Sequence, residues 1–427
     1  MKEYDVIIVG TGVSGLFAAL NLSAERKILI ITKGKLDQSD SNLAQGGICV
    51  QLDEEDHDSF MEDTLKAGHY ENSREAVDVM IKGSRDVISD LEGFGVRFDR
   101  ENGEYSYTRE GAHSRARILH CKDTTGREIN STLLDRVIDM KNVDILEDTT
   151  LVDILAKDGR CFGIVARMPD QSLRNIYAQV TILATGGIGG LFKKSTNYPH
   201  LTGDAVAIAL KHGIRVKDID YIQIHPTALY TDKPGRAFLI SESVRGEGAV
   251  LLDRNGERFT DELQPRDVVT RKILEQMEKD DMPYVRLCLK DHVRADIRER
   301  FPNIYQHCLK EGYDITKECI PVVPAQHYFM GGLEVDLMSR TSMSNLYAVG
   351  ETSCNGVHGR NRLASNSLLE SLVFSKRAAL DIENAWEKKD HPVFPEPEYP
   401  EKDKMAEDDK RMILEEIRKE EEDAEEH

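Results

Sequence analysis

Short apolar runs broken by glycine-rich turns open the chain and predict a βαβ unit. Tyr4 to Val9 (YDVIIV) reads as a buried strand. The helix-forming run LFAALNLSAE and a second strand, Lys27 to Ile31, follow within about 30 residues, as such a unit requires. Between them stands Gly10-Thr11-Gly12-Val13-Ser14-Gly15, whose glycines allow a tight turn and close approach to a pyrophosphate. A glycine turn without a ligand is the alternative. The second strand ends in Thr32-Lys33 rather than an acidic residue, so an unusual ribose contact is expected.

Further strands and helices are predicted towards the middle of the chain. A loop rich in Ser, Asn and Gly, DSNLAQGGI (Asp40 to Ile48), contains Gly46-Gly47, where the backbone can meet a ring system. The pattern of apolar residues then predicts helices at Ser59 to Ala67 and Ser73 to Phe94, and strands at Val143 to Leu146, Leu151 to Lys157, Gly163 to Met168 and Ala178 to Ala184. The last strand runs into ATGG, a second glycine turn that we expect beside the same nucleotide.

Sheet character returns in the segment YAVGETSCNGVHGRNRLASNSLLE. An apolar strand, Leu346 to Val349, ends in Gly350-Glu351, where a carboxylate can accept hydrogen bonds from the hydroxyls of a ligand. Arg360 and Arg362 follow, and arginines can clamp a carboxylate or a phosphate. Asn366-Ser367 then begin a helix, whose N-terminus favours anions. The segment suits a large anionic cofactor beside a small anionic substrate.

The order of these elements predicts an interrupted domain. We expect an α/β protein in which a Rossmann-like nucleotide-binding domain is discontinuous, over residues 1–216 and 329–385. Residues 217–328, with charged helical stretches, would form an inserted α+β capping domain that can close over the cofactor. Residues 386–427 hold a Pro-rich linker (HPVFPEPEYP) and a charged helix (DKMAEDDKRMILEEIRK) with a thin apolar stripe. The final EEEDAEEH is expected to be solvated or disordered.

Composition narrows the class of protein. The chain has 427 residues, enough for two domains, and a net charge of −20, which argues against a nucleic-acid partner. Apolar runs stay short of the about 18 residues of a membrane span, and the start MKEYDVIIVG enters a strand directly, so neither a membrane nor a signal peptide is expected. The seven cysteines are scattered and lack a CxxC pair. This pattern predicts reduced thiols in a cytoplasmic protein, without a disulfide framework or zinc site.

Two histidines stand out as candidates for substrate binding. His225 in QIHPTALY precedes a proline that keeps its backbone extended, and His327 follows a proline-stiffened run in IPVVPAQHYFMGG. Either histidine alone would more often be structural. Together with Arg362 and Ser241 of the triplet SES, they form a donor set that fits two carboxylates on one small molecule.

Two further charged residues are candidates, each with a plainer alternative. Arg266 in QPRDVV either joins the donor set or is a solvent-exposed arginine in a first helical turn. Glu110 in YTREGAHSRARI belongs either to the site or to a surface ion-pair cluster with its sequence neighbours Arg109, His113, Arg115 and Arg117. The run HSRARILHC matches no ligand spacing for a metal, so no metal site is expected.

These motifs in this order resemble the succinate dehydrogenase/fumarate reductase flavoprotein family, and within it the members that oxidise L-aspartate. The resemblance runs from Tyr4 to about Ala379 and rests on GTGVSG, SNLAQGG, TREGAHSRARILH, ATGG, HPTALY, SESVRGEGA, PRDVV, IPVVPAQHY and HGRNRLASNSLLE. It implies FAD as the cofactor. The implied FAD contacts are Gly10, Thr11, Gly12, Val13, Ser14, Gly15, Lys33, Asp40, Ser41, Asn42, Leu43, Ala44, Gln45, Gly46, Gly47, Asp204, Glu351, Ser367 and Leu368.

The resemblance also implies roles at the substrate. The dicarboxylate contacts would be His225, Ser241, His327 and Arg362. Glu110 would contact the substrate amino group, and its sequence neighbours, three arginines and a histidine, are expected to keep it ionised. Arg266 would transfer a proton, although a guanidinium holds its proton so strongly that an electrostatic role serves equally well.

The implied reaction is FAD-dependent oxidation of L-aspartate to iminoaspartate, with O₂ (giving H₂O₂) or fumarate as electron acceptor. It would be the first step of de novo NAD biosynthesis, with quinolinate synthase as a candidate partner. The alternatives are a soluble fumarate reductase or succinate dehydrogenase-type flavoprotein, and a non-enzymatic flavin-binding protein. FAD should be bound non-covalently, because Asp40 stands where membrane-bound relatives attach it through a histidine. The C-terminal helical bundle of the family is expected to be absent or truncated here.

Overall fold

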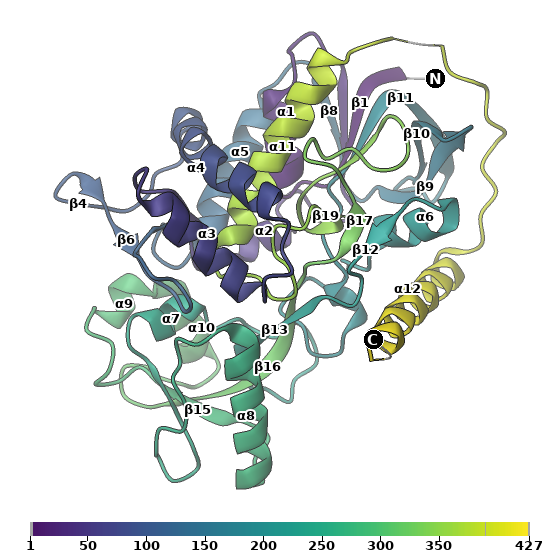
Figure 1. The fold of residues 1–427 in the computed structure, drawn as a ribbon. Coiled ribbons are helices and arrows are strands. Elements are labelled where there is room, and N and C mark those ends of the chain that lie inside the picture. The colour runs from purple at the N-terminus through teal and green to yellow at the C-terminus, as the bar shows by residue number, and fades with distance from the viewer. Residues whose placement is uncertain (1–2, 389, 426–427) are drawn as a thin grey trace.

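A large twisted sheet organises the structure, which is a computed structural model describing residues 3–388 and 390–425 (Figure 1). Within those residues this sheet has seven strands, in the order β8-β2-β1-β11-β10-β9, with β18 also paired to β11. The strands are β1 (Glu3–Val9), β2 (Ile28–Ile31), β8 (Val143–Leu146), β9 (Thr150–Lys157), β10 (Arg160–Arg167), β11 (Leu173–Leu183) and β18 (Leu346–Ala348). β8, β2, β1, β11 and β18 are parallel, whereas β10 and β9 extend the sheet antiparallel. The carboxyl ends of the parallel strands therefore share one edge, where open α/β sheets bind ligands.

Both faces of this sheet are covered, which explains the continuous apolar runs Val6 to Val9 in β1 and Ile28 to Ile31 in β2. On β1, Val6 and Ile8 belong to one hydrophobic core, and Ile7 and Val9 belong to the other. The first core holds α1 (Val13–Asn21), α3 (Asp56–Ala67), α4 (Arg74–Phe94), α5 (Thr125–Ile138) and α11 (Asn366–Asn384). The second holds α6 (Asp204–His212) and one face of α12 (Lys402–Glu425). We call this part of the molecule the nucleotide lobe.

Residues 222–329, from the start of β13 to the end of β16, form a second part, which we call the inserted lobe. Its sheet runs β13-β16-β15-β14, all antiparallel, with bounds Ile222–Leu229, Ile320–Phe329, Val285–Cys288 and Val250–Leu252. Its helices are α7 (Glu242–Gly246), α8 (Arg266–Asp280), α9 (Ile297–Arg300) and α10 (Pro302–Lys310). A separate hydrophobic core lies inside it, and Figure 1 shows it below the nucleotide lobe. The chain leaves the nucleotide lobe after β12 (Val216–Lys217) and returns to it at β17 (Gly332–Glu334). These two strands pair with each other, so both crossings between the lobes lie side by side.

The remaining elements are short. They are the helix α2 (Asp40–Leu43), the 3-10 turns η1 (Gly189–Leu191) and η2 (Gly350–Thr352), and the strands β3 (Ile48–Cys49), β4 (Arg100–Glu101), β5 (Glu104–Tyr105), β6 (Tyr107–Thr108), β7 (Ile118–Leu119) and β19 (Ser353–Cys354). Strand β7 pairs with both β3 and β6, and β19 pairs with β17.

The inserted lobe corrects one expectation, that the chain would contain no disulfide. Cys288 and Cys319 are joined by a disulfide, and the other five cysteines are free and buried. Cys288 ends β15, and the antiparallel register that pairs Leu287 with Ile320 places Cys288 opposite Cys319. Spacing along the sequence carried no sign of this pairing, because it depends on how two distant strands align.

The C-terminal helix α12 packs against α6. Ile413 and Ile417, one turn apart on its apolar stripe, are buried in the core of that face. Asp409 forms an ion pair with Lys211 of α6, and Glu420 accepts a hydrogen bond from the backbone N of Ile219 at 2.9 Å. The run EEEDAEEH was expected to be solvated or disordered. Disorder is wrong for most of it, because the helix continues to Glu425, whereas Glu421 and Glu422 are exposed to solvent as expected. Residues 426–427 lie outside the described residues.

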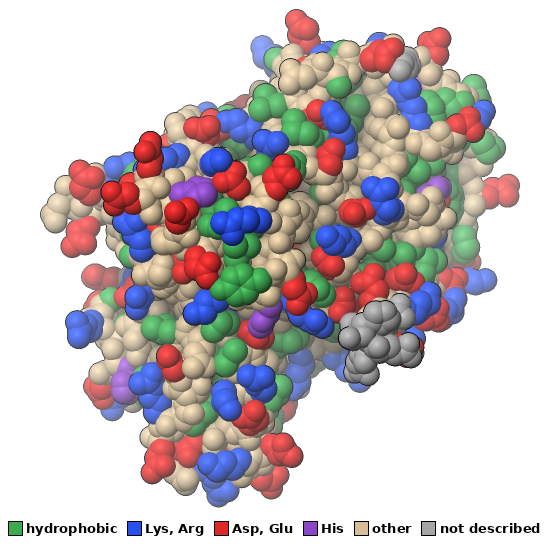
Figure 2. Space-filling view, in the orientation of Figure 1, with side chains coloured by type: hydrophobic (Ala, Val, Ile, Leu, Met, Phe, Trp, Pro, Cys, Tyr) green, Lys and Arg blue, Asp and Glu red, His purple; other side chains and the backbone are tan. Residues whose placement is uncertain are grey.

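On the face shown in Figure 2, basic and acidic side chains are interspersed, with acidic residues gathered near α12. Among the helices of the described residues, none combines the length and the apolar character that crossing a membrane requires.

Candidate active site

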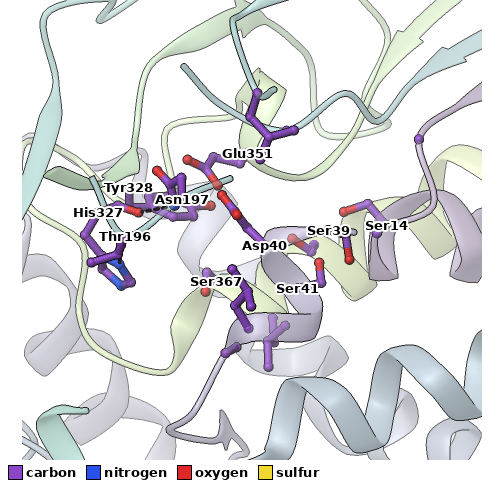
Figure 3. Close-up of a pocket in the computed structure, with 18 of the residues that line it drawn as sticks. Ser14, Ser39, Asp40, Ser41, Thr196, Asn197, His327, Tyr328, Glu351 and Ser367 are labelled. Carbon is purple, nitrogen blue, oxygen red and sulfur yellow. Dashed lines mark hydrogen bonds between the residues drawn. The ribbon is translucent and has the colours of Figure 1, made fainter. Parts of the chain in front are cut away.

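A cavity of about 1560 Å³, counting its open mouth, lies at the carboxyl edge of the parallel strands and reaches the inserted lobe (Figure 3). Most of the residues expected to contact the cofactor line it: Gly10, Thr11, Gly12, Ser14, Lys33, Asp40, Ser41, Leu43, Ala44, Gln45, Gly46, Gly47, Asp204, Glu351, Ser367 and Leu368. Val13, Gly15 and Asn42 are not part of the lining. A Cβ on Gly15 would instead collide with the carbonyl oxygen of Gly10, and the side chain of Asn42 donates to the carbonyl of Asp37.

The first glycine turn brings backbones close together at one end of the cavity. Gly10 has φ +122°, and a Cβ there would strike the carbonyl oxygen of Ala184, the residue after β11. Gly12 caps α1, and a Cβ on it would lie 3.1 Å from Oγ of Ser41. Because α1 starts here, the positive end of its dipole lies at the cavity, as a pyrophosphate site requires. The N–H of Val13, the first residue of α1, donates to Oγ of Ser41 at 3.2 Å.

Lys33 follows the end of β2, at the position where a nucleotide-binding βαβ unit usually has an acidic residue. Its Nζ donates to Oγ1 of Thr202 at 2.8 Å and to Oδ1 of Asp204 at 2.9 Å. Asp204 begins α6, and all three side chains line the cavity. Thr202 was not predicted to belong to this group, because no sequence motif marks it.

Two carboxyl groups meet in the middle of the cavity, where Figure 3 shows Asp40 and Glu351 facing each other. Glu351 accepts a hydrogen bond from the backbone N of Phe329 at 3.0 Å, and Asp40 accepts one from Tyr198 N at 2.9 Å. Burial raises the pKa of both, and Asp40 raises that of Glu351 further. Oδ2 of Asp40 is buried without a hydrogen-bond partner among the described residues. Such an atom fits the hydroxyls of a bound ligand.

At the other end of the cavity the two candidate histidines lie together, with ring centroids 5.0 Å apart. Burial and the nearby Arg266 lower the pKa of both well below the usual value, so both rings are neutral at neutral pH. Nδ1 of His225 accepts a hydrogen bond from the backbone N of Thr227, so its proton is on Nε2. That Nε2 is buried and has no partner among the described residues, so it is available as a donor to a ligand.

Of the two arginines expected to clamp an anion, only Arg362 lines the cavity. It is 4% exposed, its Cζ lies 4.2 Å from the centroid of the Tyr328 ring, and burial and Arg266 lower its pKa to about 10. It therefore stays charged at neutral pH. Arg360 instead points away, towards Glu71 and Asp220, and is half exposed.

Arg266 is held from two sides, which excludes the alternative of a solvent-exposed arginine. Its Nε donates to Glu242 at 2.6 Å and its Nη1 donates to Oε1 of Gln223 at 2.8 Å. Burial alone would raise the pKa of Glu242, but Arg266 and Arg245 lower it below the usual value. Ser241 precedes Glu242, lines the cavity, and accepts a hydrogen bond from the backbone N of Ser243.

Glu110 lies in the cavity wall, not in a surface cluster. It is 3% exposed and accepts a hydrogen bond from Oγ of Ser365 at 2.6 Å. The reason expected for its ionisation is wrong, because Arg115 and Arg117 are occupied elsewhere, in ion pairs with Asp53, Asp56 and Asp63. Burial, and then the charge of Glu242, raise the pKa of Glu110.

Sequence reasoning missed several residues of the lining, including Ser39, Thr196, Asn197, Thr202, Arg236 and Tyr328. Most of them lie in irregular segments without a recognisable motif. Within the described residues, no group of three or more His, Cys, Asp or Glu side chains is placed to hold a metal ion.

Comparisons with known proteins agree with this geometry. The FAD binding domain family matches residues 5–368. The chain is 51% identical over 414 residues to the L-aspartate oxidase of Clostridium perfringens (strain 13 / Type A), covering 97% of this chain and 94% of that protein. It is 51% identical over 385 residues to the L-aspartate oxidase of Clostridium acetobutylicum, covering 90% of this chain and 88% of that protein. A solved E. coli quinol fumarate reductase chain superposes with a TM-score of 0.83 at 29% identity, covering 97% of this chain and 74% of that one. The chain belongs to the FAD-binding flavoprotein family that includes the L-aspartate oxidases and the succinate dehydrogenase and fumarate reductase flavoproteins.

Proposed function

We propose that this protein binds FAD non-covalently and oxidises L-aspartate to iminoaspartate, with O₂ or fumarate as the final electron acceptor. One observation carries the proposal. Two neutral histidines, two arginines and a serine converge on one end of a cofactor-sized cavity, and a buried carboxylate, Glu110, lies in its wall. This set matches a small molecule with two carboxylates and one ammonium group.

The chain's residues fit FAD along the length of the cavity. The N-terminus of α1 beside Gly10 and Gly12 suits the pyrophosphate, and the carboxyl groups of Asp40 and Glu351 suit hydroxyls. Lys33 and its partners would lie at the nucleotide end. FAD held by these residues would supply an acceptor for the hydride of the substrate Cα.

The donor set would hold the two substrate carboxylates and so fix Cα. Nε2–H of His225 and the guanidinium of Arg362 both lack a protein partner for at least one donor atom, which leaves them free for an anion. His327 and the hydroxyl of Ser241 complete the set. Holding both ends of a four-carbon acid turns binding energy into orientation, which lowers the barrier to transfer from Cα.

Arg266 would either stabilise charge on the substrate near the reacting carbon or transfer a proton to or from the substrate. Its fixed position, between Glu242 and Gln223, leaves Nη2 without a bond to either residue. In the oxidation of aspartate, the arginine would stabilise the substrate electrostatically without reorganising. Proton transfer through the same side chain is the role that family resemblance suggests.

We also propose that residues 217–328 act as a capping domain over a nucleotide domain formed by residues 1–216 and 329–385, with residues 386–427 as linker and tail. In support, His225, Ser241, Arg266 and His327 come from the inserted lobe, whereas Glu110 and Arg362 come from the nucleotide lobe. The site is complete only when both lobes face each other.

Anaerobic reduction of the purified holoenzyme tests the proposal. L-Aspartate should bleach the visible flavin band and yield iminoaspartate, which hydrolyses to oxaloacetate and ammonia. Readmitted O₂ should restore the band with formation of H₂O₂, and fumarate should restore it with formation of succinate. Bleaching by succinate but not by aspartate would favour a succinate dehydrogenase-type enzyme instead. No bleaching by either would indicate a flavin-binding protein without this chemistry.

Two wider expectations follow from the same proposal. Iminoaspartate is unstable, so an enzyme that condenses it, such as quinolinate synthase in NAD biosynthesis, is the partner that we expect, in the cytoplasm. Co-elution of the two proteins, or faster quinolinate formation when they are mixed than when they are separated by a dialysis membrane, would support this.

A further inference from the structure

Residues 194–197 of the nucleotide lobe run alongside the end of β16 in the inserted lobe and grip it through several hydrogen bonds. The backbone N of Thr196 donates to the carbonyl of Gln326 at 2.9 Å, and Gln326 N donates to the carbonyl of Lys194 at 3.0 Å. The side chain of Asn197 donates to the carbonyl of His327 at 3.0 Å. This contact, which we call the β16 clamp, fixes the backbone on which His327 stands.

Within the clamp, one side chain reaches the ring of His327. Oγ1 of Thr196 lies 2.7 Å from Nδ1 of His327, and Figure 3 shows the two residues beside each other. Thr196 is 4% exposed and lines the cavity. The contact is therefore a short, buried hydrogen bond at Nδ1, which leaves Nε2 of the same ring for other partners.

The direction of this hydrogen bond follows from what else the hydroxyl can reach. Its other acceptor is the carbonyl of Gln326, at 3.4 Å, and that oxygen already accepts from Thr196 N at 2.9 Å. A hydroxyl carries one proton, and O–H donors prefer distances near 2.7 Å. The nearer acceptor is Nδ1 of His327 at 2.7 Å, so the geometry favours donation of the Oγ1 proton to Nδ1 over the longer contact with Gln326. Burial, Arg266 and Arg362 keep the pKa of His327 well below its usual value, so the ring is neutral and carries a single proton. With Nδ1 accepting from Thr196, that proton would be on Nε2.

We propose that Thr196 is a positioning residue that holds His327 in the tautomer with its proton on Nε2, so that both histidines of the site present N–H donors to a dicarboxylate. The proposal rests on the function proposed above. At His225 the same tautomer is set by the backbone N of Thr227. Removing the backbone N–H of residue 227 would require a proline that also constrains the strand, so Thr196 is the side chain through which the tautomer can be tested with least disturbance.

The expected consequence concerns binding more than the chemical step. Without the hydroxyl, His327 can carry its proton on Nδ1, and the Nε2 lone pair then faces a carboxylate. Thr196→Val keeps the shape of the side chain and removes the hydrogen bond. The dissociation constant of succinate, followed by its perturbation of the flavin spectrum, should rise by about tenfold to a hundredfold, the usual effect of losing a hydrogen bond to a charged group. KM for aspartate should rise in parallel, with a smaller change in kcat.

Two further variants separate this role from a structural one. Thr196→Ser keeps the hydroxyl and should bind succinate within about twofold of wild type. Ser195→Ala removes two buried hydrogen bonds of the same clamp, from Ser195 Oγ to Oε1 of Gln326 at 2.6 Å and from Asn197 N to Ser195 Oγ at 3.0 Å. Neither involves the ring of His327, so succinate binding should also stay unchanged. Histidine-selective ¹⁵N labelling should show a changed tautomer for one histidine in Thr196→Val only.

The outcomes are distinguishable. Unchanged succinate binding in Thr196→Val, or equal weakening in Ser195→Ala, overturns the proposal. Failure of Thr196→Ser to restore binding overturns it as well. If wild type binds succinate and the variants behave as expected but aspartate is not oxidised, the inference about Thr196 holds and the proposed function fails. A wild-type protein that does not bind succinate overturns both.

Discussion

Replacement of Glu110 by glutamine tests what distinguishes aspartate from a plain dicarboxylate. The two histidines and Arg362 should hold the carboxylates of aspartate and of fumarate alike, whereas only aspartate carries an ammonium. Glutamine keeps an oxygen for the hydrogen bond from Ser365 Oγ, so the local structure should persist. What is lost is a charge-assisted hydrogen bond of about 1.5–3 kcal/mol, or roughly ten- to a hundredfold in kcat/KM for aspartate.

The assay compares aspartate oxidation with fumarate reduction by an artificial electron donor, in wild type and in Glu110→Gln. Fumarate reduction should change little. The pH dependence gives a second test. Because burial and Glu242 raise the pKa of Glu110, the carboxyl gains a proton and loses its charge as the pH falls through that value. Aspartate kcat/KM should therefore fall on the acidic side in wild type, and this fall should be weaker in the variant.

A matched control is Arg115→Gln. Arg115 is close to Glu110 in the sequence, but in the structure it forms an ion pair with Asp53. This substitution should leave both activities unchanged. If both activities fall together in Glu110→Gln, the residue supports the structure or the cofactor, and its role in discrimination is refuted.

Three further predictions follow. Arg362→Leu leaves a substrate carboxylate unpaired in a buried site, which costs about 3–5 kcal/mol. Its kcat/KM for aspartate should fall by several hundredfold or more with a normal flavin spectrum. A variant that keeps most of its turnover would show that Arg362 does not bind a substrate carboxylate. FAD should separate from the polypeptide on a denaturing gel, because Asp40 stands where the family resemblance places the histidine that attaches FAD in other members, and a yellow band that migrates with the protein would contradict this. Arg117→Leu strands the carboxylates of Asp56 and Asp63, which it bridges at 2.9 and 2.5 Å, and should lower the free energy of unfolding in urea by about 3–5 kcal/mol; a loss below about 1 kcal/mol, as for a surface pair, would show that the bridge is not structural.

The nucleotide lobe was predictable because its signals are local. The second strand was expected at Lys27 to Ile31 and occupies Ile28–Ile31, since a short apolar run after a glycine turn and a helix has few alternatives. Helix α4 begins after Ser73, which caps it by accepting from Ala76 N, and ends before Gly95 at φ +112°. Caps and glycine stops of this kind can be recognised in the sequence.

The features that were missed depend on distant partners. The disulfide of Cys288 requires the register of β15 on β16. The surroundings of Glu110 could not be predicted, because its sequence neighbours Arg115 and Arg117 form ion pairs with Asp53 and Asp56, which lie earlier in the chain. Thr196 stands in KKSTN, an irregular segment without a motif, and its contact with His327 joins two lobes. Sequence patterns report which face of an element is buried, but not which side chain of another element meets it.

The pairing of β18 with β11 means that the large sheet is completed by a strand from late in the chain. β18 begins at Leu346, and α11, which follows it, packs on α1 near the start of the chain. The inserted lobe has its own core and antiparallel sheet, so it has the contacts to fold while the nucleotide lobe still lacks a strand and a helix. Because domains tend to fold as units during synthesis, the cofactor cavity takes shape only after residues up to Asn384 have been made. Since the binding site joins segments so far apart in sequence, we expect the chain to bind its cofactor late, after the inserted lobe has formed.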